Sequence, residues 1–305
     1  MPDYLFCLLR YKMWVLFAFL SALFAGGTAI LVKIGVKDID SNIATAIRTI
    51  IIVIFTWIMV FVTGSNVSGI DTRSAIFLIL SGATTGLSWL CYFRALQLGD
   101  INKVVPIDKS SIVLSILLSF ILLGETVTVY KITGMFLIAI GTYSMIEKKE
   151  SENKKIENRN NDINNKKNWL FYGILSALFA ALTFILGKIG IKNVDSNYGT
   201  ALRTVVVLIM AWLVVLVTKK GKEVQKMNMK TFVFLILSGI STGLSWLCYY
   251  RALQDGDVSI VVSIDKLSIV VSVLFSYIVF NEKLSRKSFL GFIGIITGTF
   301  IMLIK

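Results

Sequence analysis

The 305-residue sequence contains no histidine, only two prolines and only three cysteines. Without histidine, the chain lacks the commonest general base of enzymes and the commonest metal ligand. The cysteines are Cys7, Cys91 and Cys248, and their spacing fits neither a zinc site nor a disulfide framework. Phosphate-binding glycine loops and HExxH sequences are missing as well. We therefore expect no catalytic residue, no metal and no cofactor, and we predict that the protein is not an enzyme.

Acidic residues are scarce, because 18 Asp and Glu stand against 31 Lys and Arg, which gives a net charge of +13. Such a surplus can indicate nucleic-acid binding, but these basic residues are dispersed between apolar segments rather than gathered on one domain. Hydrophobic residues make up 56% of the chain, more than the core of a soluble protein of this length needs. The composition predicts an integral membrane protein in contact with the lipid bilayer, with no nucleic-acid partner.

Long apolar runs follow one another along almost the whole chain. They cover residues 14–34, 43–63, 75–98, 102–124, 128–146, 169–190, 198–218, 231–254, 258–280 and 287–304. At about 1.5 Å per helical residue, each run is long enough to cross the ~30 Å hydrocarbon layer of a membrane. We predict an all-α polytopic membrane protein with ten transmembrane helices.

The sequence is internally duplicated. Residues 81–100 recur at residues 238–257 with 16 of 20 positions identical. A polar stretch at residues 147–168, rich in Asn, Lys and Glu, is predicted to be a flexible linker. It separates a first five-helix repeat, residues 1–146, from a second, residues 169–305. Because five is odd, the second repeat must enter the membrane from the opposite side, so we predict inverted repeats.

The orientation follows from the basic residues of the connections. Most of them lie on the membrane side that holds the linker. The positive-inside rule therefore favours a cytoplasmic linker and places both termini outside.

Each copy of the repeated block sets aromatic and polar side chains within apolar sequence. These are Ser88, Trp89 and Tyr92 in the first copy and Ser245, Trp246 and Tyr249 in the second. Side chains three or four positions apart share a helix face. We predict that both sets line one polar substrate cavity between the halves; the alternative is aromatic packing between helices.

Charged residues lie within the apolar segments near this block. They are Arg94, Asp108 and Lys109 and their repeat equivalents Arg251, Asp265 and Lys266. A charge at membrane depth is costly and usually faces a cavity or a partner. Each arginine is positioned to pair with the aspartate of its own copy. Two interpretations remain open: a structural ion pair, or a role in substrate binding or proton coupling.

A second set of charges lies near the ends of the apolar segments. It comprises Lys33, Arg48 and Glu125 and their equivalents Lys188, Arg203 and Glu282. Inversion brings Glu125 to the level of Lys188 and Arg203, and Glu282 to the level of Lys33 and Arg48, so we predict salt bridges between the halves. The alternative is that each glutamate interacts with the N-terminus of the helix that follows it.

Two pairs of glycines recur at a spacing of seven residues, Gly134 with Gly141 and Gly291 with Gly298. Small residues on one face let helices pack closely in lipid. The glycines predict packing of residues 128–146 against 287–304 within the chain, or alternatively a homodimer seam.

These features together resemble the EamA-type carriers of the drug/metabolite transporter superfamily. The resemblance rests on Lys33 with Arg48, Lys188 with Arg203, the two GLSWLCY blocks, the two V-x-I-D-K segments, Gly124-Glu125 and Asn281-Glu282. One departure is Ser263, which stands in the second copy where the first has Pro106. The resemblance implies ten helices in inverted halves and a central cavity walled by the third, fourth, eighth and ninth helices. It also favours cytoplasmic termini, opposite to the charge distribution.

The resemblance implies a secondary transporter in a bacterial cell membrane. It would move a small polar or amphipathic metabolite or drug by alternating access, in the direction of export. Since the sequence has no nucleotide-binding motif, the energy would come from the substrate gradient or a coupled ion, with Asp108 and Asp265 as candidate proton carriers. The alternative is a non-transporting membrane sensor or scaffold that uses the linker to bind partners.

Overall fold

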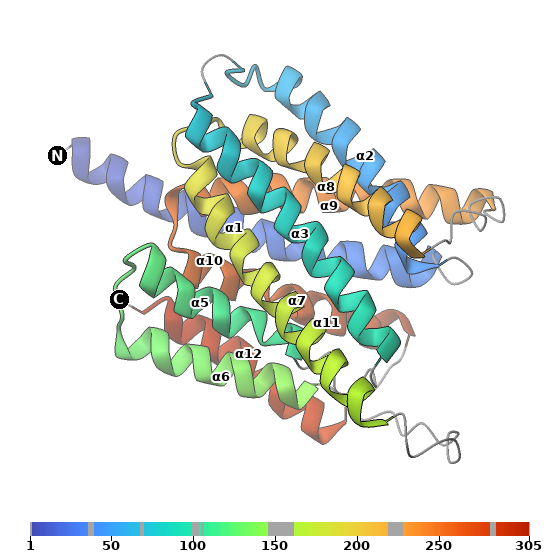
Figure 1. Cartoon of the computed structure of the whole chain (residues 1–305). Coiled ribbons are helices and arrows are strands. Elements are labelled where there is room, and N and C mark those ends of the chain that lie inside the picture. The colour runs from blue at the N-terminus through green and yellow to red at the C-terminus, as the bar shows by residue number, and fades with distance from the viewer. Residues whose placement is uncertain are drawn as a thin grey trace.

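The computed structural model describes residues 2–35, 40–67, 70–98, 104, 107–145, 162–218, 228–280 and 285–304, and this part of the chain is all-helical (Figure 1). The first half contains α1 (Pro2–Gly35), α2 (Ser41–Val62), α3 (Thr72–Leu98), α5 (Ser111–Leu122) and α6 (Val129–Met145). The second half contains α7 (Asp162–Ile191), α8 (Ser196–Thr218), α9 (Met229–Asp255), α10 (Val258–Asp265), α11 (Ser268–Phe280) and α12 (Arg286–Met302).

Seven stretches of helix are long and apolar enough to cross a membrane: Met13–Val32, Asn42–Val62, Thr72–Tyr92, Asn168–Ile191, Ser196–Thr218, Met229–Asp255 and Val258–Phe275. The remaining helices are shorter, with 12 residues in α5 and 17 each in α6 and α12. Large apolar side chains face outward around the bundle, and Phe61, Ile121, Val129 and Ile278 are between 72 and 75% exposed. Such an apolar surface suits hydrocarbon rather than water.

Several helix boundaries differ from the sequence prediction, among them the start of α1 at Pro2 instead of residue 14. The run at residues 258–280 is interrupted after Asp265, where Lys266 caps α10 and its N–H bonds Ile264 O. Because the Asp-Lys pair needs a polar environment, a helix break at this point can direct it into a cavity. The first repeat has the same pair before α5, which begins only at Ser111. Helix α7 begins at Asp162, within the predicted linker, whose residues 147–161 lie outside the described part.

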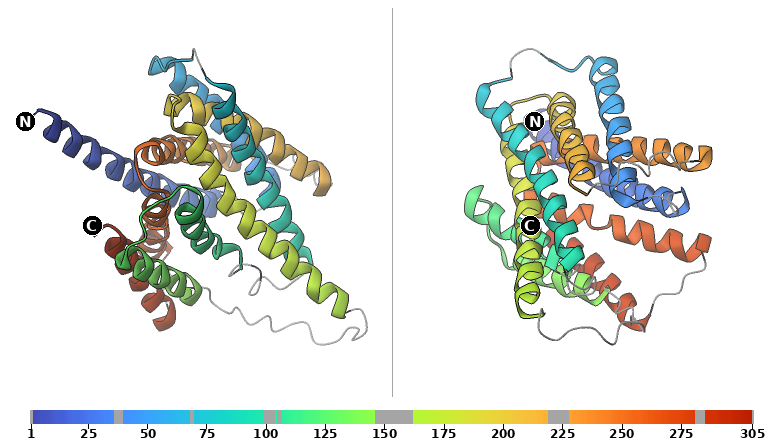
Figure 2. Two further views of the ribbon diagram at one scale, coloured as in Figure 1. Left: turned by 60° about the vertical axis from the view of Figure 1, so that its left-hand side comes forward. Right: turned by 45° about the vertical axis from the view of Figure 1, so that its right-hand side comes forward.

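Helices of one half pack mainly on helices of the other half. Helix α1 packs along α9 and α3 along α7, so the first helix of each half lies on the third helix of the other (Figure 2). The equivalent helices α2 and α8 also pack together, as do α6 and α12. A two-fold rotation that places each half on the position of the other would reproduce all of these helix pairs.

The equivalent helices run antiparallel. In α6 and α12, a Cβ atom on Gly134 would lie 2.6 Å from Gly298 O, and one on Gly141 would lie 2.6 Å from Gly291 O. Only glycine permits so close a backbone approach. The predicted packing within the chain is therefore confirmed, and the alternative of a homodimer through these glycines stays a prediction.

The connections between helices gather at two ends of the bundle. Both termini, the turns from α5 to α6 and from α7 to α8, and the turn from α9 to α10 lie at the left end in Figure 1. The turn from α9 to α10 closes one side of the space between the halves.

Candidate functional site

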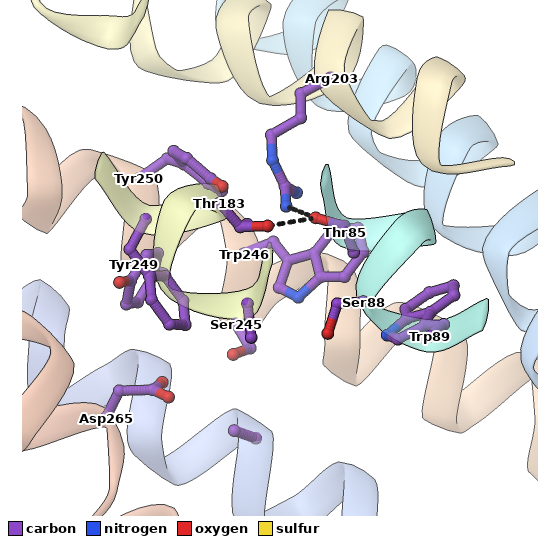
Figure 3. Close-up of a pocket in the computed structure, with 13 residues that line it drawn as sticks. Thr85, Ser88, Trp89, Thr183, Arg203, Ser245, Trp246, Tyr249, Tyr250 and Asp265 are labelled. Carbon is purple, nitrogen blue, oxygen red and sulfur yellow. Dashed lines mark hydrogen bonds between the residues drawn. The ribbon is translucent and has the colours of Figure 1, made fainter. Parts of the chain in front are cut away.

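Two adjoining cavities lie between the halves. The first, of about 270 Å³, is lined by Asp265 and we name it the Asp265 cavity (Figure 3). The second, of about 460 Å³, is lined by Asp108 and we name it the Asp108 cavity. Five residues line both cavities: Ser88, Trp89, Ala180, Phe184 and Trp246. The two spaces are therefore neighbours across a largely aromatic partition.

The side chains predicted to line a substrate cavity all lie here. Ser245 and Tyr249 line the Asp265 cavity, and Tyr92 lines the Asp108 cavity. Ser88, Trp89 and Trp246 belong to the shared partition. That these six residues bind a substrate stays a prediction.

Each cavity aspartate accepts a hydrogen bond from the other half of the chain. Ser176 Oγ on α7 donates to Asp108 Oδ1 at 2.8 Å, and Ser21 Oγ on α1 donates to Asp265 Oδ1 at 3.1 Å. Ser21 and Ser176 are equivalent residues of the two repeats. The two carboxylates therefore have matching supports, each supplied across the interface between halves.

The same serines also hold the third helix of the opposite half. Ser88 Oγ donates to Ser176 O at 3.0 Å, and Ser245 Oγ donates to Ser21 O at 3.1 Å. A hydroxyl that bonds a helix carbonyl satisfies itself without water, which is needed inside a membrane. This pairing joins α3 to α7 and α9 to α1.

Two arginines extend the cross-half network. Arg203 Nη2 donates to Thr85 Oγ1, and Arg48 Nη2 donates to Thr242 Oγ1, both at 2.6 Å. Each of these threonine hydroxyls also lies within 3.3 Å of a threonine hydroxyl on the first helix of the opposite half. Thr85 and Thr242 are equivalent, as are Arg48 and Arg203.

The two arginines nevertheless differ in their surroundings. Arg203 Nε donates to Ser81 Oγ at 3.0 Å, and its guanidinium lies 5.3 Å from the Trp246 ring centroid and 4.9 Å from that of Tyr250 (Figure 3). In contrast, Arg48 Nε is buried and has no hydrogen-bond partner in the described part of the chain. The charge of Arg203 is enclosed by hydroxyls and ring faces, whereas Arg48 faces the Asp108 cavity with a donor unused.

Equivalent residues around the two cavities are unequally exposed. Tyr249 is only 6% exposed, whereas its equivalent Tyr92 is half-buried. Lys109 is exposed, whereas its equivalent Lys266 is half-buried, and the two cavity aspartates are both half-buried. The second-repeat side is therefore the more closed of the two.

Glu125 of the first half holds the closed side. Its carboxylate accepts hydrogen bonds from the backbone N–H groups of Val258 and Ser259 and from the Ser259 hydroxyl. These N–H groups belong to the first turn of α10, where the helix has unpaired donors and a positive dipole end. Glu125 thus binds the N-terminus of a helix in the other half.

Two lysines, Lys131 and Lys188, complete this closure. We name the set of Glu125, Lys131 and Lys188 the α9–α10 latch. Lys131 Nζ donates to Asp257 Oδ2 at 2.8 Å, across the halves. Lys188 Nζ donates to the carbonyl oxygens of Leu253 and Gly256 at 2.6 and 2.7 Å, at the end of α9. Acid at the start of one helix and base at the end of another is the arrangement that helix dipoles favour.

Known proteins share the sequence pattern and the fold of this chain. The sequence pattern of the EamA-like transporter family matches residues 12–146 and 167–304. The chain belongs to the EamA-like transporter family. A curated relative from Sinorhizobium sp., the "Uncharacterized transporter in cobO 3'region", is 39% identical over 136 residues, which are 45% of this chain and 96% of that protein. A solved crystal structure of a protein with 16% sequence identity superposes with a TM-score of 0.76, covering 95% of this chain and 96% of the other.

The match confirms the resemblance and the membrane location of this EamA-like transporter. The curated relative corresponds in length to one half of the chain. The solved structure shows that the fold of the whole bundle recurs in another protein.

One predicted ion pair needs correction. Arg251 lies 4.0 Å from Asp255 and donates to Gln254 at 3.0 Å, so it does not make the predicted pair with Asp265. The reason is position, since Arg251 is exposed on α9 whereas Asp265 turns toward α1. Arg94 is exposed as well, and its pairing with Asp108 stays a prediction.

The predicted bridges of Glu125 to Lys188 and Arg203 are also different in the structure. Glu125 and Lys188 meet the same turn between α9 and α10, but each bonds backbone groups there, while Arg203 lines the Asp265 cavity. Free N–H groups at a helix start provide several donors to one carboxylate. The side chain of Lys33 and all of Glu282 lie outside the described residues, so their predicted bridge is untested.

Sequence reasoning missed the hydroxyls that join the halves. Ser21 and Ser176 lie in the LSALFA run that both first helices share, and Thr85 and Thr242 lie in the repeated block. Their recurrence in both copies was a signal, but single hydroxyls in apolar runs are common and carry little information by themselves.

We predict that Arg203→Gln destabilises the EamA-like transporter more than Arg48→Gln. The first change removes hydrogen bonds to Ser81 and Thr85 and two ring contacts, whereas the second removes one hydrogen bond to Thr242. A hydrogen bond to a charged group contributes about 1.5–3 kcal/mol. Thermal unfolding midpoints in one detergent check the order, and a lower midpoint for Arg48→Gln than for Arg203→Gln would contradict it.

Proposed function

We propose that this chain is a secondary transporter that moves a small polar or amphipathic solute by alternating access. The supporting observation is that equivalent residues of the two repeats have different exposure around adjoining cavities. Because the two repeats have equivalent side chains, the first repeat can adopt the environment that the second has in this structure, and the second can adopt that of the first. The same contacts would then open one side of the membrane while closing the other.

We further propose that the chain crosses the membrane ten times as two inverted halves. The antiparallel packing of α6 on α12 supports inversion, since parallel repeats would place equivalent neighbours parallel. The gathering of both termini at one end of the bundle supports an even number of crossings. In this proposal α10 and α11 form one interrupted span, and the shorter α5, α6 and α12 each cross once.

The proposed solute site is the space shared by the two cavities. Trp89 and Trp246 provide flat apolar faces, while Ser88 and Ser245 provide hydroxyls. Asp108 and Asp265 are the proposed coupling groups, because each is a carboxylate held at a cavity wall by a serine of the other half. Export is the proposed direction.

The proposed transport is tested in proteoliposomes. Purified protein is first screened by thermal shift against amino acids, polyamines, quaternary ammonium compounds and phosphorylated metabolites. A stabilising compound is then followed across the liposome membrane with and without a pH gradient. We expect protein-dependent flux, and we expect Asp265→Asn to abolish its acceleration by the pH gradient. Compounds that bind but show no flux above protein-free liposomes would count against a transporter.

Alternating access makes a separate prediction for an equivalent pair of positions. Thr45 lines the open Asp108 cavity, whereas its equivalent Thr200 is fully buried. In a background without native cysteines, we expect Thr45→Cys to react rapidly with a water-soluble maleimide and Thr200→Cys to react slowly.

Adding Glu125→Gln should reverse this preference, because the neutral amide holds the start of α10 less strongly and weakens the α9–α10 latch. The labelling rate at position 200 should rise and the rate at position 45 should fall. Rates that stay the same with and without Glu125→Gln would argue against the latch as the closure.

A further inference from the structure

The Asp108 cavity contains one cation whose charge nothing in the described part of the chain balances. Arg48 makes a hydrogen bond to Thr242 at 2.6 Å, and its buried Nε has no partner. A buried donor without an acceptor costs about 1–3 kcal/mol, and more when it is charged. The fold tolerates this cost at a wall of a cavity of about 460 Å³.

Each lysine around the cavity follows an aspartate in the chain. Lys109 Nζ lies 3.8 Å from Asp108 Oδ2. Lys266 follows Asp265, whose carboxylate lines the adjoining cavity. Two lysines therefore stand against two aspartates, and Arg48 remains as the surplus cation.

The equivalent arginine shows what Arg48 lacks. Arg203 is 3% exposed, has its Nε bonded to Ser81, and lies against Trp246 and Tyr250. Ser238 is the equivalent of Ser81, but its hydroxyl donates to Leu235 O within its own helix. Among the described residues, Arg48 Nε therefore has no hydroxyl partner equivalent to the one that Ser81 provides to Arg203.

The remaining cavity wall defines the other part of a ligand. Trp89, Trp246, Phe184 and Tyr92 all line this space. Rings of this kind suit an apolar, ring-sized body, whereas a guanidinium with a free Nε suits a carboxylate that can accept two hydrogen bonds.

Resting on the proposed transport function, we infer that the Asp108 cavity binds an organic monocarboxylate with a ring-sized apolar body. Its acid group pairs with Arg48 and its body lies among the aromatic side chains. The bound anion balances the surplus charge and satisfies Arg48 Nε. This assigns the solute class and names Arg48 as the residue that selects for negative charge.

Four compounds with one phenyl body separate the possible charges. They are 3-phenylpropionate, L-phenylalanine, phenethylamine and 3-phenylpropan-1-ol, and the readout is the dissociation constant from tryptophan fluorescence with the purified wild-type protein. We expect 3-phenylpropionate to bind about tenfold or more tightly than each of the others. Preferential binding of the amine, the alcohol or the amino acid would overturn the inference, and this comparison needs no variant.

Arg48 is tested directly with three variants. We expect Arg48→Gln to weaken 3-phenylpropionate binding about tenfold or more and Arg48→Lys to restore part of it. Lys287→Gln removes the same charge from an exposed position on α12 and should leave the affinity unchanged. An unchanged affinity in Arg48→Gln, or an equal loss in Lys287→Gln, would overturn the assignment.

The two proposals fail in different ways. If 3-phenylpropionate binds through Arg48 but crosses no liposome membrane, then transport is wrong and the anion site remains. If liposomes instead show flux of the amine or the alcohol in preference to the acid, then transport remains and the anion site is wrong.

Discussion

Polar groups inside hydrocarbon must be satisfied by the protein itself, and in this chain each half supplies the partners that the other half needs. Asp108 depends on Ser176, and Asp265 depends on Ser21. Arg203 reaches Thr85 in the first half. A single half would leave these carboxylates and donors without partners in the membrane, at a cost of several kcal/mol per group.

This dependence explains why the halves pack crosswise. Helices α1 and α7 each lie on the third helix of the other half rather than on their own. Because both halves belong to one chain, each half has the partners that the other half supplies beside it.

The same symmetry also makes the differences between the repeats informative. The latch around Glu125 closes the end of α9 and α10, while Asp108 and Lys109 remain accessible. Two environments for one repeated segment are what the proposed alternation between openings requires. The unused donor of Arg48 belongs to the open environment.

Much of the fold was predictable from the sequence because the duplication is strong. The repeated block identified the cavity walls, and the spaced glycines identified the contact of α6 with α12. The partners of charged groups were less predictable. Glu125 binds backbone N–H groups at a helix start, and Arg251 lies near Asp255 one turn along its own helix. Such nearby partners compete with distant charged residues for the same side chain. Sequence spacing does not show which partner the side chain contacts.

The most direct test of the account is the membrane side of two equivalent positions. Asp71 and Asn228 are exposed residues just before α3 and α9. Single cysteines at these positions, labelled with an impermeant maleimide in sealed vesicles of known orientation, should react from opposite sides of the membrane. Labelling of both positions from the same side would show that the halves are not inverted. It would contradict the proposed solute site between them.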